Sequence, residues 1–191
     1  MTSVDDMEFR MARPEDTEAI EALDGSFTTR TVFQVAVTAD GFTLREIPVD
    51  PPVHKVFPAE SGDEDDGDGS DAAVEEDPNS RTFVAVGSDG CLAGFASVSY
   101  TPWNRRLVID DFEVAPPYRR LGVGRALVSR AAEFARERGA GHLWLEVTNI
   151  NAPAIHAYRR MGFVFCGLDT MLYAGTPSSG EHALYMSMPC P

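Results

Sequence analysis

The segment from residue 107 to residue 139 constrains the fold of this chain more than any other. Residues 107–114 have the composition of a strand, and a turn rich in Pro, Arg and Gly follows them. After the turn, apolar residues recur at helical spacing until Gly139 ends the pattern, at Val123, Leu127, Ala131, Phe134 and Ala135. A strand that passes through a short turn into an amphipathic helix predicts a layered protein in which helices cover a sheet.

The start of this predicted helix has the features of an anion-binding site. No Ser, Thr, Asp or Asn stands at the natural N-cap, so the first amide donors of the helix have no internal partner. Free donors and the positive end of the helix dipole attract phosphate, and Gly122 and Gly124 would let it approach the backbone closely. Arg119, Arg120 and Arg125 add positive charge. The alternative is an ordinary capping loop with exposed arginines.

Two other phosphate-binding loops do not fit this turn. A Walker loop needs Gly-Lys followed by Ser or Thr, and Lys55 is the only lysine of the chain. A dinucleotide-binding fingerprint needs a third glycine and a later acid in a parallel βαβ unit. Neither pattern is completed, so the turn requires another explanation.

The rest of the chain predicts one α+β domain over residues 1–191. Residues 9–26 are interpreted as a strand and a helix, and a second helix is expected over 152–161. Further strands are expected at 31–37, 42–49, 81–86, 91–100, 142–147, 163–168 and 184–188. Residues 60–78 are acidic and rich in Gly and Ser, so we expect them to form a mobile loop inserted into the domain.

Charge and composition exclude several classes of protein. The net charge is −14, and ten acids without a Lys or Arg lie between residues 60 and 77, which leaves about −4 for the rest. Such a surface argues against nucleic acid and permits a cationic partner. No window holds the ~18 apolar residues of a membrane span, and no secretory signal opens the chain. The three cysteines and four histidines show no metal-site spacing, and a reduced cytoplasmic protein is expected.

Two motifs resemble those of the GCN5-related N-acetyltransferase (GNAT) superfamily. Arg119-Arg-Leu-Gly122-Val-Gly124 matches its Arg/Gln-x-x-Gly-x-Gly/Ala motif, and the stretch from Asn151 through Tyr158 to Gly162-Phe resembles its second motif. Many members carry glycine where this chain has Arg120. The resemblance implies a mixed, mostly antiparallel central sheet flanked by helices. It also implies acetyl-CoA as co-substrate, bound at Phe112, Val114, Arg119, Arg120, Leu121, Gly122, Val123, Gly124, Arg125 and Asn151.

The same resemblance assigns chemistry to the strand and to the second helix. The thioester carbonyl develops negative charge during amine attack, and the family stabilises it with a backbone amide that corresponds to about Val114. Tyr158 matches the family's general acid, which protonates the leaving thiolate. The alternative for Tyr158 is a tyrosine of the hydrophobic core. Asn151 corresponds to a pantetheine-binding residue, and it can also cap the second helix.

A carboxylate is needed to take the proton of the attacking amine. We predict a catalytic role for Asp110 and Glu113, and substrate binding for Asp111 and Glu146. Strand alternation separates Asp110 from Asp111 and Glu113 unless a bulge intervenes, and the family often has such a bulge. The alternative is a solvated acidic rim, which would still attract a cationic amine.

A narrower resemblance covers nearly the whole chain. Residues 27–35, 99–106, 167–170 and 183–187, together with the acidic insert, resemble the streptothricin (nourseothricin) acetyltransferases. This implies acetylation of the β-lysine amine of a streptothricin antibiotic, and hence resistance. The alternatives are a polyamine, aminoglycoside or protein N-terminus as substrate, or a non-catalytic CoA-binding domain. Homodimers are common in the family, and the apolar strand over residues 183–188 is the candidate contact.

Overall fold

The computed structural model describes residues 4–57 and 77–190. The acidic insert predicted over 60–78 lies outside these ranges except for Asp77 and Pro78. None of the helices in the described ranges is long and apolar enough to cross a membrane.

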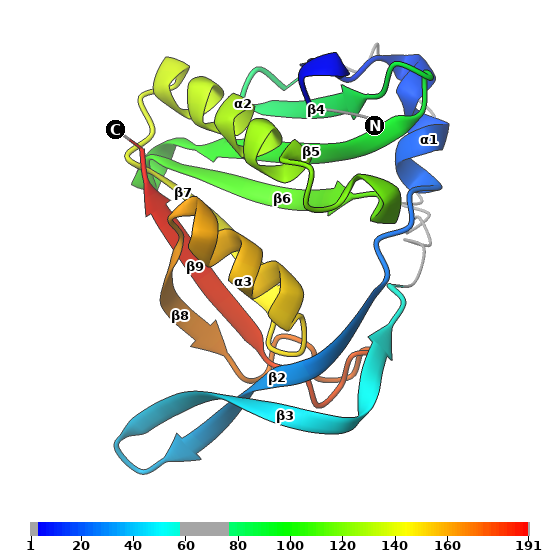
Figure 1. Ribbon diagram of the computed structural model, residues 1–191. Helices are drawn as coiled ribbons and strands as arrows, with labels where there is room; N and C mark the ends of the chain where they lie inside the picture. Colours follow the sequence, from blue (N-terminus) through cyan, green and yellow to red (C-terminus); the bar gives the residue numbers. More distant parts are fainter. Residues whose placement is uncertain (1–3, 58–76, 191) are drawn as a thin grey trace, which may run out of the picture.

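A seven-stranded sheet in the order β1-β4-β5-β6-β7-β9-β8 forms the centre of the molecule (Figure 1). Every neighbouring pair is antiparallel except β6 and β7, which are parallel. This confirms the mixed, mostly antiparallel sheet. The strands are β1 (Glu8–Met11), β4 (Ser80–Val86), β5 (Leu92–Thr101), β6 (Arg106–Val114), β7 (His142–Thr148), β8 (Val164–Asp169) and β9 (Ala183–Pro189).

Two helices cover one face of this sheet, α2 (Val123–Glu137) over its first half and α3 (Ala152–Met161) beside β7 and β9 (Figure 1). The five apolar residues predicted to face the core from α2 are all buried. Gly139 follows this helix with a φ of +69°, the left-handed conformation that ends a helix. Shorter helical segments are η1 (Val4–Asp6), η2 (Pro14–Asp16), α1 (Thr17–Glu21), η3 (Pro102–Asn104) and η4 (Pro116–Tyr118).

The two halves of the sheet join over a short parallel ladder and then diverge. β6 pairs with β7 only from Arg106 to Ile109, although both strands continue beyond that point. Figure 1 shows the strands separating from there toward the glycine turn. Between residues 110 and 114, the β7-facing edge of β6 therefore has no strand partner within the described residues.

The expected bulge in β6 is present. β5 pairs Ser97 with Asp111 and Val98 with Ile109, which leaves Asp110 as an extra residue. A bulge reverses the alternation beyond it, so Ile109 and Phe112 both face α2 and α3. Glu113 consequently points to the opposite face of the sheet. This explains why simple alternation could not assign the carboxylates.

The pair of strands predicted around residues 39–41 forms a separate ribbon. β2 (Phe27–Thr38) and β3 (Gly41–Lys55) are antiparallel and longer than the predicted ranges. Phe33 attaches the ribbon to the body: its N–H donates to the carbonyl of Asn149 and its carbonyl accepts from Asn149 Nδ2, both at 2.8 Å. The Phe33 ring also lies 5.7 Å from that of His156 on α3.

The dimer contact predicted through residues 183–188 lies on an inner strand of the sheet and stays a prediction. These residues belong to β9, which pairs with β7 on one side and β8 on the other. Their backbone groups are thus used within the sheet. The sheet edge at this end is β8, where Val164 is 61% exposed.

Candidate active site

The glycine turn joins the end of β6 to α2 and leaves the helix start uncapped, as predicted. Gly122 occupies the N-cap position with a φ of +98°, and no side chain caps the helix. Arg120 also has a positive φ of 65°. Residues 120–122 are exposed, so the free amides at the start of α2 are open to a ligand.

The two glycines have structural reasons beyond the approach of a phosphate. Gly122 adopts a left-handed conformation that other residues rarely accept. A Cβ on Gly124 would lie 3.2 Å from Cζ of Phe112, tighter than ordinary contact. Gly124 therefore allows α2 to pack closely on β6.

Arg119 binds backbone carbonyls of the protein. Its Nε donates to the carbonyl of Val114 at 2.8 Å, and its Nη1 donates to that of Ser26 at 2.8 Å. Its Nη2 donates to the carbonyl of Asp24 at 3.3 Å. The guanidinium thus fixes the turn against the end of β6 and against the loop before β2.

The other two arginines of the turn are exposed. Arg125 Nη2 donates to the carbonyl of Arg160 at 3.1 Å and so links the start of α2 to the end of α3. The Arg120 side chain is exposed and makes no hydrogen bond to another described residue.

Tyr158 lies on α3 inside the core and is 7% exposed. Its ring packs between Phe112 and Phe163, with centroid distances of 5.9 and 5.8 Å. Burial raises the pKa of the Tyr158 phenol well above its ordinary value, and the charges of Glu146, Asp111 and Glu113 raise it further. Tyr158 is therefore a residue of the hydrophobic core, and three of the predicted site carboxylates raise the pKa of its phenol.

Glu113 is the carboxylate with the most perturbed titration. Burial raises its pKa to about 7, helped by the charge of Asp111 and, more weakly, Asp24, while Arg119 lowers it. A carboxylate with this pKa can accept a proton near neutral pH.

Asp110 has a different setting. Its Oδ1 accepts a hydrogen bond from Ser99 Oγ at 3.0 Å, and burial raises its pKa. It is absent from the charges that act on Tyr158. The charges of Asp111, Glu113 and Glu146 therefore act on the tyrosine, whereas Asp110 lies on the bulge beside β5.

Residues that sequence reasoning missed surround Glu146. Tyr173, in the segment between β8 and β9, donates a hydrogen bond to its carboxylate, whose pKa is raised by burial. Glu181 of the same segment accepts from Thr148 Oγ1 at 2.6 Å and forms an ion pair with Lys55 of β3. No local pattern in the sequence signals these contacts, because each joins segments far apart along the chain.

Asn151 caps α3 as predicted, with its side-chain oxygen accepting from the amide of Ala154 at 3.2 Å. Pro153 lies in the first turn, and Gly162 ends the helix with a φ of +110°. His156 pairs with Glu46 at 2.9 Å and is half-exposed.

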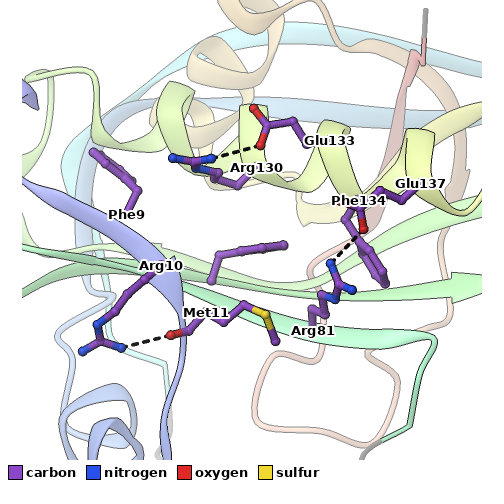
Figure 2. A pocket seen from close by; sticks show the side chains of 9 residues that line it. Phe9, Arg10, Met11, Arg81, Arg130, Glu133, Phe134 and Glu137 are labelled. Atoms are coloured by element: carbon purple, nitrogen blue, oxygen red, sulfur yellow. Dashed lines mark hydrogen bonds and ion pairs between the residues drawn. The ribbon is translucent and has the colours of Figure 1, made fainter.

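A separate hollow of about 210 Å³ lies over the C-terminal half of α2, away from the glycine turn (Figure 2). Its charges are paired among themselves: Arg130 with Glu133 at 3.1 Å and Arg81 with Glu137 at 2.9 Å. Arg10, at its edge, is held by Asp16 at 2.6 Å. With its charges satisfied, this hollow offers less for binding a charged substrate than the site around Tyr158.

The uncapped start of α2 can bind a phosphate group, and Glu113 and Tyr158 are groups that can move protons, features expected of an enzyme that uses a phosphorylated carrier. The Acetyltransferase (GNAT) family matches residues 44–163, and the chain belongs to this family. It is an acetyl-CoA-dependent N-acetyltransferase.

Three relatives place it more closely. Streptothricin acetyltransferase from Streptomyces lavendulae is 71% identical over 184 residues, covering 96% of this chain and 95% of that protein. The crystal structure of a nourseothricin acetyltransferase matches with a TM-score of 0.88 and 66% identity, covering 97% of this chain and 99% of that one. A Bacillus anthracis protein, proposed to be a streptothricin acetyltransferase and crystallised with acetyl coenzyme A, matches with a TM-score of 0.76 and 25% identity, covering 96% and 98%.

Proposed function

We propose that this enzyme transfers the acetyl group of acetyl-CoA to the β-lysine amine of streptothricin-class antibiotics and thereby confers resistance. The observation that carries the proposal is the 71% identity, over 96% of the chain, to a streptothricin acetyltransferase. The three negative charges that act on Tyr158, those of Asp111, Glu113 and Glu146, support a cationic substrate.

The glycine turn is proposed to hold the pyrophosphate of the cofactor. The exposed amides of residues 120–122 and the start of α2 supply donors, and Arg120 supplies an exposed charge. The unpaired edge of β6 supplies backbone groups for the pantetheine arm, to which Asn151 also contributes. The amide of Val114 would then donate to the thioester oxygen as it becomes negative. When bound, acetyl-CoA supplies an activated acyl carbon and a thiolate leaving group.

Glu113 is proposed as the general base. The amine nitrogen attacks the thioester carbon, and Glu113 takes the proton that this nitrogen loses, directly or through one water. A pKa of about 7 leaves a large fraction of the carboxylate ionised at neutral pH while keeping it basic enough to act. Asp110 is the weaker candidate because its carboxylate already accepts a hydrogen bond from Ser99 of the neighbouring strand β5.

Tyr158 is proposed as the general acid that gives its proton to the departing thiolate as the carbon–sulfur bond breaks. In the free enzyme burial, and after it the charges of the three carboxylates, raise the pKa of the Tyr158 phenol and make it a weak acid. A cationic substrate bound among Asp111, Glu113 and Glu146 would offset these charges and lower the pKa of Tyr158 toward the range useful for proton donation. Substrate charge and acid strength would thus be coupled.

The test is a panel of amines incubated with enzyme and acetyl-CoA, followed by thiol release and product mass. The panel contains streptothricin, an aminoglycoside, spermidine and a peptide with a free N-terminus. Rapid thiol release with streptothricin and one acetyl group on its β-lysine are expected. Turnover only with another amine would contradict the substrate, and acetyl-CoA binding without any turnover would favour a non-catalytic role.

We also infer a cytoplasmic, homodimeric enzyme, by analogy with the family. The predicted contact on β9 would have to form through side chains, because its backbone groups are used within the sheet, and the exposed edge of β8 is the alternative surface. Light scattering of the purified protein should give twice the chain mass of 20.8 kDa, and the monomer mass would contradict the proposal.

A further inference from the structure

The loop over residues 22–26 joins α1 to β2 and runs directly past Glu113. A Cβ built on Gly25 would lie 2.2 Å from Oε1, 2.5 Å from Cδ and 2.8 Å from Oε2 of Glu113. No side chain other than hydrogen fits between this backbone and the carboxylate. The φ of Gly25 lies outside the left-handed region, so space, and not backbone conformation, requires a glycine here.

Arg119 clamps this loop on both sides of Gly25. Its guanidinium donates to the carbonyls of Asp24 and Ser26, at 3.3 and 2.8 Å, and to that of Val114 at the end of β6. The Asp24 carboxylate in turn accepts from the amide of Ser26 at 2.9 Å, which closes the loop on itself. The loop is therefore fixed to the same strand that carries Glu113.

Three charged groups act on Glu113 from the surrounding elements. Asp111 lies on the same strand, Asp24 on the loop and Arg119 on the glycine turn. The largest effect on the pKa of Glu113 is burial, with Asp111 and Asp24 adding to it and Arg119 opposing it. Because the backbone of Gly25 covers the carboxylate, the loop supplies part of that burial.

We infer that Gly25 is a positioning residue for Glu113: its missing side chain lets the carboxylate lie sheltered under the loop that Arg119 holds. This rests on the proposed role of Glu113 as the base. The arrangement also links the glycine turn to the proposed base, because Arg119 fixes both the turn and the loop that covers Glu113. No sequence motif contains Gly25.

The test is Gly25→Ala, with Gly141→Ala as the matched control. In the first variant the crowded atoms are the end of a flexible side chain, so the fold should survive while the carboxylate swings toward solvent. In the control the backbone is also outside the left-handed region, and the nearest atom to the new Cβ is Arg105 O at 3.9 Å. Both variants add the same methyl group, but only one displaces Glu113.

Two measurements are compared. Carboxyl ¹³C NMR titration of glutamate-labelled enzyme, assigned with Glu113→Gln, gives the pKa of Glu113 without any need for turnover. The pH dependence of kcat/KM for acetyl transfer gives the acid limb.

In Gly25→Ala we expect the pKa of Glu113 to fall from about 7 toward its ordinary value of 4.5, by at least about one unit. The acid limb should move down equally, with a rate at high pH lowered about tenfold. Gly141→Ala should match the wild type in both.

An unchanged pKa of Glu113 in folded Gly25→Ala would overturn the inference. A pKa that falls while the acid limb stays in place would keep the shelter but refute Glu113 as base, which is a failure of the proposed function. If Gly25→Ala does not fold, the double variant Gly25→Ala/Glu113→Asp decides, because a shorter side chain makes room for the methyl group. Recovered folding supports the contact, and continued failure overturns it.

Discussion

The two long helices of the domain each follow a strand and a connecting turn, yet their first turns are built differently. Asn151 caps α3 and Pro153 occupies its first turn, so part of the need for hydrogen-bond partners is met within the chain. α2 begins at a left-handed Gly122 with no side-chain cap. If stability alone decided, a side-chain cap would be expected at the start of both helices. The difference agrees with the proposal that a ligand takes the place of the cap at α2, whereas the start of α3, the helix that carries Tyr158, is fixed by the protein itself.

The largest effect is expected from a change on α3 that tests the proposed chemical role of Tyr158. Tyr158→Phe removes the proposed acid but keeps the ring between Phe112 and Phe163, so kcat should fall about a hundredfold or more. Acetyl-CoA affinity, which we propose to be set at the start of α2, should stay within twofold of the wild type by calorimetry. Wild-type turnover in this variant would remove Tyr158 from the mechanism and leave it as a core residue only.

Glu113 gives a pH-dependent form of the same test. With a pKa of about 7 in the free enzyme, kcat/KM should rise with pH as the carboxylate loses its proton. Below that pKa it should fall about tenfold per pH unit, since only the ionised form accepts a proton. Glu113→Gln should abolish this limb and leave a low, nearly flat profile. A limb that survives in Glu113→Gln would point to another base, with Asp110 next in order.

A cap added to α2 should weaken cofactor binding. Gly122→Asp places a carboxylate where the pyrophosphate is proposed to lie, while Gly122→Asn adds a neutral cap and tolerates the left-handed backbone. Asp and Asn have nearly the same shape, so their difference isolates the charge. The Asp variant should bind acetyl-CoA about tenfold more weakly than the Asn variant, an effect that high salt reduces. Equal affinities would refute the anion site at this turn.

Removing the cap from α3 should have the smallest effect, on stability. Asn151→Ala loses the bond to the amide of Ala154 and should cost about 1 kcal/mol. For a chain of this size the midpoint of thermal unfolding should fall by about 2–4 °C. Asn151→Asp keeps a capping oxygen and should stay close to the wild type. If Asn151→Ala melted with the wild type, the contrast between the two helices would rest on α2 alone.

Local patterns were sufficient for the helices and for most strands. α3 runs over residues 152–161 as predicted, because its cap, its periodicity and its terminal glycine all lie within one short segment. β3 extends past its predicted end at residue 49 although prolines follow. Proline lacks the N–H that a strand ladder needs. Thr31 pairs with Pro48 and Thr29 with Val53, so Pro51 and Pro52 lie in an irregularity of the ladder, where a residue without an N–H is tolerated.

The candidate site was predictable only in part. The motif residues and the carboxylates on β6 and β7 were identified, but choosing among the carboxylates required the bulge at Asp110, which depends on pairing with β5. The shelter of Glu113 by Gly25 and the bond from Tyr173 to Glu146 join segments distant in the chain. Such contacts are products of tertiary packing, and no local pattern encodes them.

The short ladder between β6 and β7 has a mechanical consequence. In the described part of the chain, a ladder of four residue pairs joins the strands β1-β4-β5-β6 to the strands β7-β9-β8, and a bond from Gly141 N to Arg105 O continues it just before the two strands. The two halves of the sheet should therefore move relative to one another about this ladder. A cofactor arm bound along the open edge of β6 would contact both halves and restrict that motion. Amide exchange at residues 106–109 should slow when acetyl-CoA binds, even though these residues lie outside the open edge of β6.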